Sequence, residues 1–116
     1  MGRRSRRQAL PAVEPSEYTD AEGNVLALRG SLSAGSRREY SQAMAGSPLS
    51  REDAQARAFE LLFEKLAVRW TIAGAPIERQ RDLLARLRVA SPAERAWVRG
   101  AVREHCAEYF PDVQAP

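Results

Sequence analysis

An apolar segment that stops at a glycine and a proline constrains the fold of this 116-residue chain more than any other feature. Ser50 precedes the segment as a helix N-cap, and Asp53 stands at the third helical position, where a capping box and the helix dipole both favour an acidic residue. Gly74 is a natural left-handed terminator, and Pro76 cannot continue a helix. We therefore expect a central helix from Ser50 to about Thr71, followed by a sharp turn.

The apolar side chains of this segment repeat with helical spacing and extend onto a second face, which predicts a central helix with neighbours on more than one side. Aromatic side chains anchor interfaces and cores for the same reason, since one rigid group buries a large area at low entropic cost. The apolar side chains with this spacing form one stripe along the helix. This stripe and a second tryptophan are therefore our candidates for partner contact. These candidate partner-binding residues are Phe59, Leu62, Phe63, Leu66, Trp70 and Trp97.

Before the central helix, the sequence predicts one β element and one short helix. The turn composition of Asp20–Asn24 followed by the apolar run Val25–Leu28 predicts a small β-hairpin or a single strand. Ser33 or Ser36 is then a helix N-cap, and Gly46 is the matching terminator.

After the central helix, two more helices are expected. Residues 77–90 form an amphipathic third helix. Ser91, Pro92 and Glu94 start the last helix with a capping box and a proline at its first position, and Pro111 ends it. The expected fold class is mainly α, with a short N-terminal β-hairpin or strand followed by about four helices in a small bundle.

Composition divides the chain into one domain and two ends. Residues 1–16 combine four arginines with prolines and few large apolar side chains, so we expect a disordered basic arm. Residues 17–113 are expected to form a single mostly helical domain, with a frayed tail at residues 114–116. The arginines of the arm account for more than the whole formal net charge of +3. Because a folded nucleic-acid reader carries its own basic face, this distribution disfavours nucleic acid as a partner.

No group of residues in the sequence supports catalysis. The single histidine and single cysteine, His105 and Cys106, exclude a disulfide framework or a zinc site of Cys and His within one chain, and they indicate a reducing compartment. Consecutive residues on a helix point about 100° apart, so a structural role for both is favoured over a nucleophilic pair. Glu104 and Glu108 are better explained as part of a solvated charged face.

Phosphate-binding and membrane-spanning signals are also missing from the sequence. It contains no glycine-rich phosphate loop and no apolar run of the roughly 18 residues that a membrane span needs. We therefore expect a cytoplasmic protein that is not an enzyme and has no cofactor, metal, small-molecule substrate or membrane contact.

The order of these features resembles the tail assembly chaperones of long-tailed bacteriophages (siphoviruses) and prophages, particularly those of actinobacterial hosts. The resemblance covers about residues 17 to 113 and rests on "GNVLALRGSLSAGSRREY", "SREDAQARAFELLFEKLAVRWTIAGAPI" and "SPAERAWVRGAVREHCAEYFPD". Its most specific part is "VRWTIAGAPI", which is similar to the Val-x-Trp junction and Gly-x-Pro turn of such proteins.

This resemblance implies a non-enzymatic protein in the cytoplasm of an infected or lysogenic bacterial host. Such a protein binds the tape-measure protein, keeps its long apolar helices soluble, and is displaced as tail-tube subunits polymerise. The implied partners are the tape-measure protein and the tail-tube subunit, with self-association left open. On this hypothesis, a groove between the two C-terminal helices accepts an amphipathic helix of the partner.

Two alternatives remain open from the residues. A small DNA-associated regulator would use the last two helices together with the arginines Arg3, Arg4, Arg6 and Arg7. Residues 77–105 have the outline of a helix-turn-helix, but the second helix opens with Pro92, Ala93 and Glu94, which do not read base edges. The other alternative is a structural connector subunit of the virion.

Overall fold

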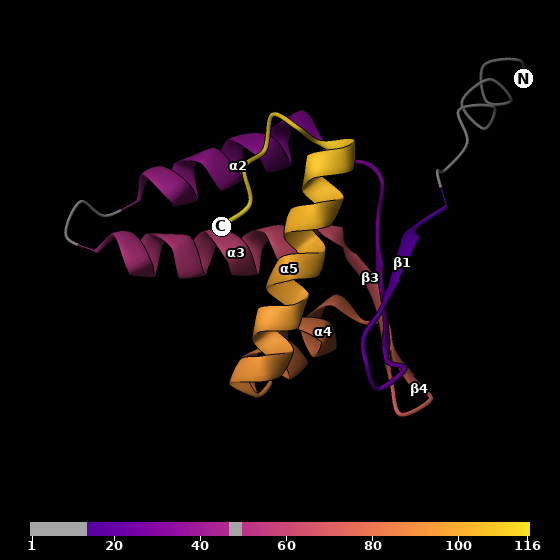
Figure 1. Cartoon of the computed structure of the whole chain (residues 1–116). Helices are drawn as coiled ribbons and strands as arrows, with labels where there is room; N and C mark the ends of the chain where they lie inside the picture. Colours follow the sequence, from indigo (N-terminus) through magenta and orange to yellow (C-terminus); the bar gives the residue numbers. More distant parts are fainter. Residues whose placement is uncertain (1–13, 47–49) are drawn as a thin grey trace, which may run out of the picture.

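The computed structural model describes residues 14–46 and 50–116, which form two successive units of one β-hairpin and two helices (Figure 1). The first unit contains β1 (Ser16–Thr19), β2 (Val25–Leu28), α2 (Ala34–Ala45) and α3 (Arg51–Leu66). The second contains β3 (Ala67–Ile72), β4 (Ala75–Ile77), α4 (Gln80–Arg88) and α5 (Pro92–Tyr109). The strands form one antiparallel sheet in the order β1-β2-β3-β4. The α2–α3 pair is therefore inserted between the two central strands.

The mainly helical bundle expected from the sequence is wrong, and the structure has a mixed α/β fold. The helix expected to reach Thr71 ends at Leu66, and β3 begins at the next residue. In β3 the apolar side chains of Val68, Trp70 and Ile72 alternate with more polar ones, which is the period of a strand. β-Branched and aromatic residues also fit a sheet better than a helix.

Residues 77–90 are likewise not one helix. Ile77 lies in β4, and α4 begins at Gln80. Ala73 and Gly74 connect β3 to β4, with φ values of 52° and 82°, and Ile72 is paired with Ala75. Positive φ at both central residues identifies a type I′ turn, whose twist matches that of the strands it joins. Gly74 is thus the turn residue of a hairpin rather than the terminator of a helix.

The N-terminal hairpin and three of the predicted helix starts, those of α2, α3 and α5, are confirmed. Ser33, Ser50 and Ser91 each cap a helix by accepting a backbone N–H bond with the side-chain oxygen. Ser91 and Glu94 form a complete capping box at the start of α5. Gly46 follows the last residue of α2, as predicted.

The core lies between one face of the sheet and the helices. Tyr18, Leu26, Trp70 and Ile77 occupy matching register positions, so they form one row across the four strands. Buried side chains of α3, α4 and α5 belong to the same apolar cluster as this row. Phe63 of α3, for example, packs edge-on against Trp70, with ring centroids 6.1 Å apart.

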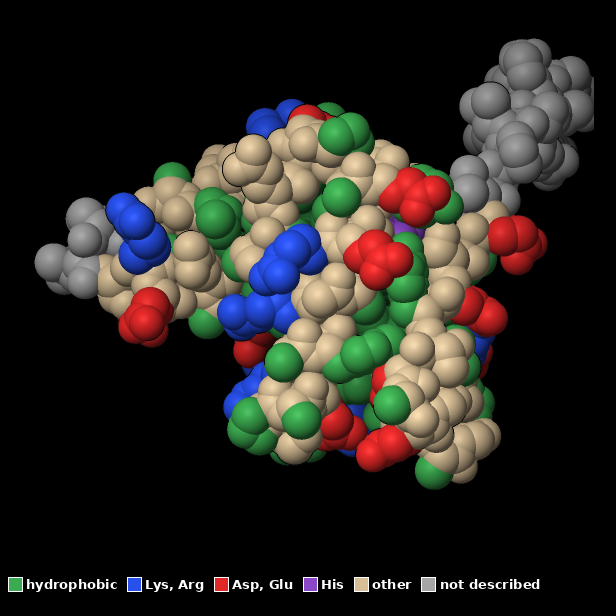
Figure 2. Space-filling view, viewed as in Figure 1, with side chains coloured by type: hydrophobic (Ala, Val, Ile, Leu, Met, Phe, Trp, Pro, Cys, Tyr) green, Lys and Arg blue, Asp and Glu red, His purple; other side chains and the backbone are tan. Residues whose placement is uncertain are grey.

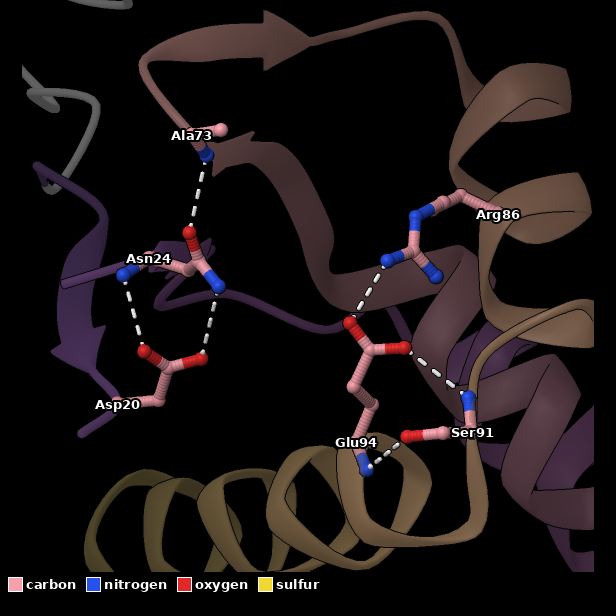
Figure 3. Close-up of polar contacts among 6 residues, drawn as sticks. All are labelled: Asp20, Asn24, Ala73, Arg86, Ser91 and Glu94. Atoms are coloured by element: carbon pink, nitrogen blue, oxygen red, sulfur yellow. Dashed lines mark hydrogen bonds and ion pairs between the residues drawn. The ribbon is translucent and has the colours of Figure 1, made fainter. Parts of the chain in front are cut away.

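A buried asparagine joins the tips of the two hairpins (Figure 3). The Nδ2 of Asn24 donates to a carboxylate oxygen of Asp20 at 3.2 Å, and its Oδ1 accepts the backbone N–H of Ala73 at 3.0 Å. The other carboxylate oxygen of Asp20 accepts the backbone N–H groups of Glu22 and Asn24. The turn of the first hairpin is therefore fixed to the turn of the second.

After α5 the chain returns towards α2 (Figure 1). The hydroxyl of Tyr40 donates to the carbonyl of Gln114, and Arg103 donates to the carbonyl of Pro116 at 2.9 Å. The residues expected to fray, 114–116, thus make hydrogen bonds to two helices. Of the expected disordered arm, residues 1–16, the first thirteen lie outside the described residues.

Candidate protein-binding site

A hollow lies between the β1–β2 hairpin and α5, with hydrophobic side chains inside it and acidic side chains beside it (Figure 2). Its larger part has a volume of about 630 Å³, and a smaller part of about 190 Å³ continues along the hairpin turn. Trp97 lines both parts, so we treat them as one site, the Trp97 hollow. The larger part is lined by Glu17, Tyr18, Thr19, Ala96, Trp97, Gly100, Ala101 and Glu104. The smaller part is lined by Asp20, Ala21, Glu22, Ala93, Glu94 and Trp97.

Helical spacing brings the α5 residues of the hollow onto one face. Positions 93, 97, 100 and 104 are three or four residues apart, so their side chains lie above one another. The neighbours of Trp97 on this face are small, namely Ala93, Gly100 and Ala101, and they leave its indole only partly buried. A partly exposed indole among small residues offers apolar area that a partner can bury.

The rim of the hollow is acidic. Five carboxylates line it, and none of the described residues that line it is Lys or Arg. Two of these carboxylates form ion pairs: Glu17 binds Arg69 at 3.2 Å, and Glu94 binds Arg86 at 2.7 Å. Hydrogen bonds from Arg86 and from the backbone of Ser91 lower the pKa of Glu94 (Figure 3). The remaining negative charge favours a cationic partner.

The opposite side of α5 carries several positively charged side chains. A hollow of about 330 Å³ lies there against α3 and the end of α4, and its lining includes Arg88, Arg95 and Arg99. The guanidinium of Arg99 lies 5.0 Å from the centre of the Phe59 ring. Glu60 of α3 also lines this hollow and pairs with Arg88 at 2.9 Å. The groove that the sequence predicted between the two C-terminal helices stays a prediction.

A buried histidine fixes β1 against α5. His105 is fully buried, and its Nε2 lies 2.9 Å from the carbonyl oxygen of Arg29 while its Nδ1 lies 2.8 Å from the hydroxyl of Tyr18. A carbonyl only accepts, so Nε2 carries the proton and Nδ1 accepts from Tyr18. Burial lowers the pKa of His105 and raises that of Tyr18 to about 12. A neutral imidazole therefore holds this wall of the hollow.

The neighbouring cysteine has no such contacts. Cys106 is buried in the core, and burial raises its pKa to about 11, which keeps it a thiol near neutral pH. Both nitrogens of His105 are already engaged, so the geometry fits a structural role for the two residues.

Glu104 and Glu108 are exposed, and Glu104 lines the Trp97 hollow. Within residues 14–46 and 50–116, no three His, Cys, Asp or Glu side chains are grouped to hold a metal ion.

The structure separates the two tryptophans that the sequence could not distinguish. Trp70 is 2% exposed and lies under the guanidinium of Arg86, 5.2 Å from the ring centre. The other members of the predicted stripe are also in the core, each at most 3% exposed: Phe59, Leu62, Phe63 and Leu66. Trp97 lines the hollow. The arginines of the alternative nucleic-acid site, Arg3, Arg4, Arg6 and Arg7, lie outside the described residues.

The hairpin side of the hollow was missed by reasoning from the sequence. The pattern predicted a strand near Tyr18 but carried no signal for the helix that it faces. The hairpin and α5 are brought together by contacts between segments that are far apart in the sequence. One example is the contact of Tyr18 with His105, 87 positions away.

Within the part of the chain that the structure describes, no helix is long and apolar enough to cross a lipid bilayer. Comparisons of the chain with protein-family models, with curated proteins and with solved structures found no match.

Proposed function

We propose that this protein is a non-enzymatic tail assembly chaperone of the bacteriophage type, which binds the tape-measure protein and keeps it soluble during tail-tube assembly. The observation that supports this proposal is the partly exposed Trp97 in an acid-rimmed hollow. The sequence resemblance over residues 17 to 113 supports the choice of client. The resemblance also implies that the protein acts in the cytoplasm of the bacterial host.

The size of the site suits a protein that must release its client. One aromatic anchor surrounded by small residues provides a short apolar contact, whereas obligate interfaces bury large apolar surfaces. The acidic rim adds attraction that steers encounter more than it slows dissociation. Binding of this kind is reversible, which an escort displaced by tail-tube subunits requires.

Co-expression with the tape-measure protein tests the proposal. We expect the wild-type chain to increase the soluble fraction of the tape-measure protein and Trp97→Ala to lose this effect, because the anchor is gone. Val89→Ser is the matched control, since Val89 is 76% exposed and lies away from the hollow. If the tape-measure protein is equally soluble with and without this chain, the proposal fails.

The two alternatives have less support. At the start of α5, where a helix-turn-helix protein reads DNA, Glu94 is engaged in a capping box and an ion pair. A salt titration of binding to random duplex DNA tests the regulator, because phosphate contacts produce a steep loss of affinity with salt. The connector alternative requires the chain to be present in purified virus particles, whereas a chaperone is absent from them.

A further inference from the structure

We propose that the outer edge of β1 accepts an extended segment of the client as a fifth strand, in which apolar residues alternate with Lys or Arg. This inference rests on the proposed function in one respect, namely that the client is a polypeptide. It adds the backbone conformation of the bound segment, its side-chain pattern and the atoms that hold it.

The backbone of β1 has unpaired groups on its outer edge. The N–H of Asp20 donates to the carbonyl of Asn24 at 2.9 Å and closes the hairpin. Bonding in an antiparallel pair alternates along the strand, so the backbone groups of Tyr18 point to β2 and those of Glu17 and Thr19 point outwards. No other described strand pairs with this edge. Glu17 and Thr19 therefore offer two N–H and two C=O groups to an incoming strand.

The opposite edge of the sheet, the outer edge of β4, does not accept an added strand in this way. Ile72 and Ala75 flank the two-residue turn and form a hydrogen-bonded pair, so the next pair, Thr71 and Pro76, is not hydrogen-bonded. The nitrogen of Pro76 consequently points outwards and has no proton to donate. Proline on an edge strand prevents pairing with another chain. Between Ser16 and Thr19, strand β1 contains no proline, so its outward positions Glu17 and Thr19 both carry N–H groups.

Helix α5 borders the space beside the free edge of β1, where that strand would lie. A helix is about 10 Å wide with its side chains, whereas neighbouring strands are about 4.8 Å apart. The larger part of the Trp97 hollow is lined by three consecutive β1 residues on one side and by α5 on the other, so it lies along the free edge and beside the helix. An added strand would continue the sheet and place alternate side chains against Trp97 and Gly100.

The charges around this space define the side chains that fit. Along β1, Tyr18 faces the helices, whereas Glu17 lies on the other face with Arg69. Side chains of the added strand that face α5 meet Trp97 and are therefore apolar. Those on the other face lie beside Glu17, where opposite charge is favoured. Glu104 adds negative charge at the rim, so the fitting pattern alternates apolar residues with Lys or Arg.

Amide hydrogen exchange of the full chain tests the mode of binding directly. The probe is a synthetic peptide of alternating valine and arginine, and the control peptide has the same composition arranged as a valine block followed by an arginine block. We expect the alternating peptide to slow exchange of the Glu17 and Thr19 amides by about tenfold or more at saturation, because each forms a new hydrogen bond. The block peptide leaves both amides unchanged.

A pair of variants provides a second measurement. Thr19→Pro removes an outward N–H while keeping the bonds to β2, so affinity for the alternating peptide should fall about tenfold. Thr19→Ala keeps the N–H, so its affinity should fall much less than that of the proline variant. The exchange experiment uses the unaltered chain, so it decides the question even if the proline variant is unstable.

Several outcomes would overturn the inference. Peptide binding that perturbs Trp97 without protecting the two amides means docking without strand addition. Protection without peptide means that the chain's own residues 1–13 cover the edge, or a second copy if protection rises with protein concentration. If Trp97→Ala abolishes solubilisation of the tape-measure protein and Thr19→Pro does not, the strand mode is wrong and the proposed function stands. If the wild-type chain itself does not raise the soluble fraction of the tape-measure protein, the proposed function fails as well.

Discussion

At the scale of single residues, Asn24 links the turns of the two hairpins. Its side chain is 8% exposed and bonds to Asp20 and to the backbone of Ala73. Asn24→Ala removes both bonds and leaves the N–H of Ala73 without its acceptor. We expect a loss of about 1–3 kcal/mol in the free energy of unfolding, because two hydrogen bonds are lost and each contributes about 0.5–1.5 kcal/mol. Urea unfolding followed by circular dichroism measures it.

Glu22→Ala is the control for this prediction. Glu22 lies in the same turn, but only its backbone N–H takes part in the network, and its side chain is exposed. The control should change the free energy of unfolding by no more than about 0.5 kcal/mol. Equal effects of the two substitutions would show that the turn, and not the Asn24 link, determines stability.

His105 makes stability depend on pH. Burial lowers its pKa in the folded state below the usual value of about 6.5 that the unfolded chain retains. The unfolded state therefore binds more protons at mildly acidic pH, and the stability contributed by neutral His105 is present above pH about 6.5 and lost as pH falls below it. We expect the urea midpoint to decrease from pH 7 to pH 5, above the range where most carboxylates titrate.

His105→Gln separates this effect from other titrations. Glutamine can donate to the carbonyl of Arg29 and accept from Tyr18, but it does not titrate. The variant should be less stable than the wild type at pH 7, since it loses the packing of a buried ring, and its midpoint should change less between pH 7 and pH 5. An unchanged pH dependence would assign the effect to other groups.

At the scale of elements, the cap of α5 is the clearest local device. The Oγ of Ser91 accepts the N–H of Glu94, whose carboxylate accepts the N–H of Ser91 and binds Arg86 (Figure 3). Ser91→Ala breaks the first of these bonds and should cost about 1 kcal/mol in the free energy of unfolding. Thermal and urea unfolding of Ser91→Asp provide the comparison, because aspartate also caps and should remain near wild type. Equal loss in both variants would contradict a capping role.

Helix starts could be predicted from the sequence because their signals are local. Ser33, Ser50 and Ser91 each stand next to the backbone groups that they cap. The change from α3 to β3 could not be predicted in the same way, since no loop, glycine or proline separates Leu66 from Ala67. Strand β3 is only six residues long, and its pattern of Val68, Trp70 and Ile72 also fits the continuation of an apolar helix face. Pairing with β2 decides between the two.

The candidate site could also be predicted only in part, because local patterns are visible in the sequence and tertiary contacts are not. The sequence identified Trp97 as a contact candidate and α5 as its helix, because the repeat along one helix is visible locally. It also proposed five residues that the structure places in the core, since an apolar stripe looks the same whether it faces a partner or the sheet. The hairpin wall could not be predicted, because Tyr18 reaches His105 only through the tertiary fold.

At the scale of the whole molecule, the two edges of the sheet differ. The outer edge of β1 is bordered by the acid-rimmed Trp97 hollow, while β4 is three residues long and carries Pro76 at its centre. Both arrangements follow from one antiparallel sheet in which the hairpins are the outer parts and the α2–α3 pair joins the central strands. On the strand-addition proposal, an incoming chain therefore pairs only on the side that is bordered by α5 and its carboxylates.

Replacing Pro76 should open the closed edge. Pro76→Val restores an outward N–H at an exposed, β-favouring position without removing a bond to β3, so the fold is retained and the edge can pair with a second copy. We expect its sedimentation coefficient to rise with protein concentration more than that of the wild type. Pro76→Lys restores the same N–H but adds a charge that opposes pairing between copies, and it should sediment like the wild type. If Pro76→Val also does so at every concentration, the shortness of β4 protects this edge, and the contrast with β1 no longer depends on proline.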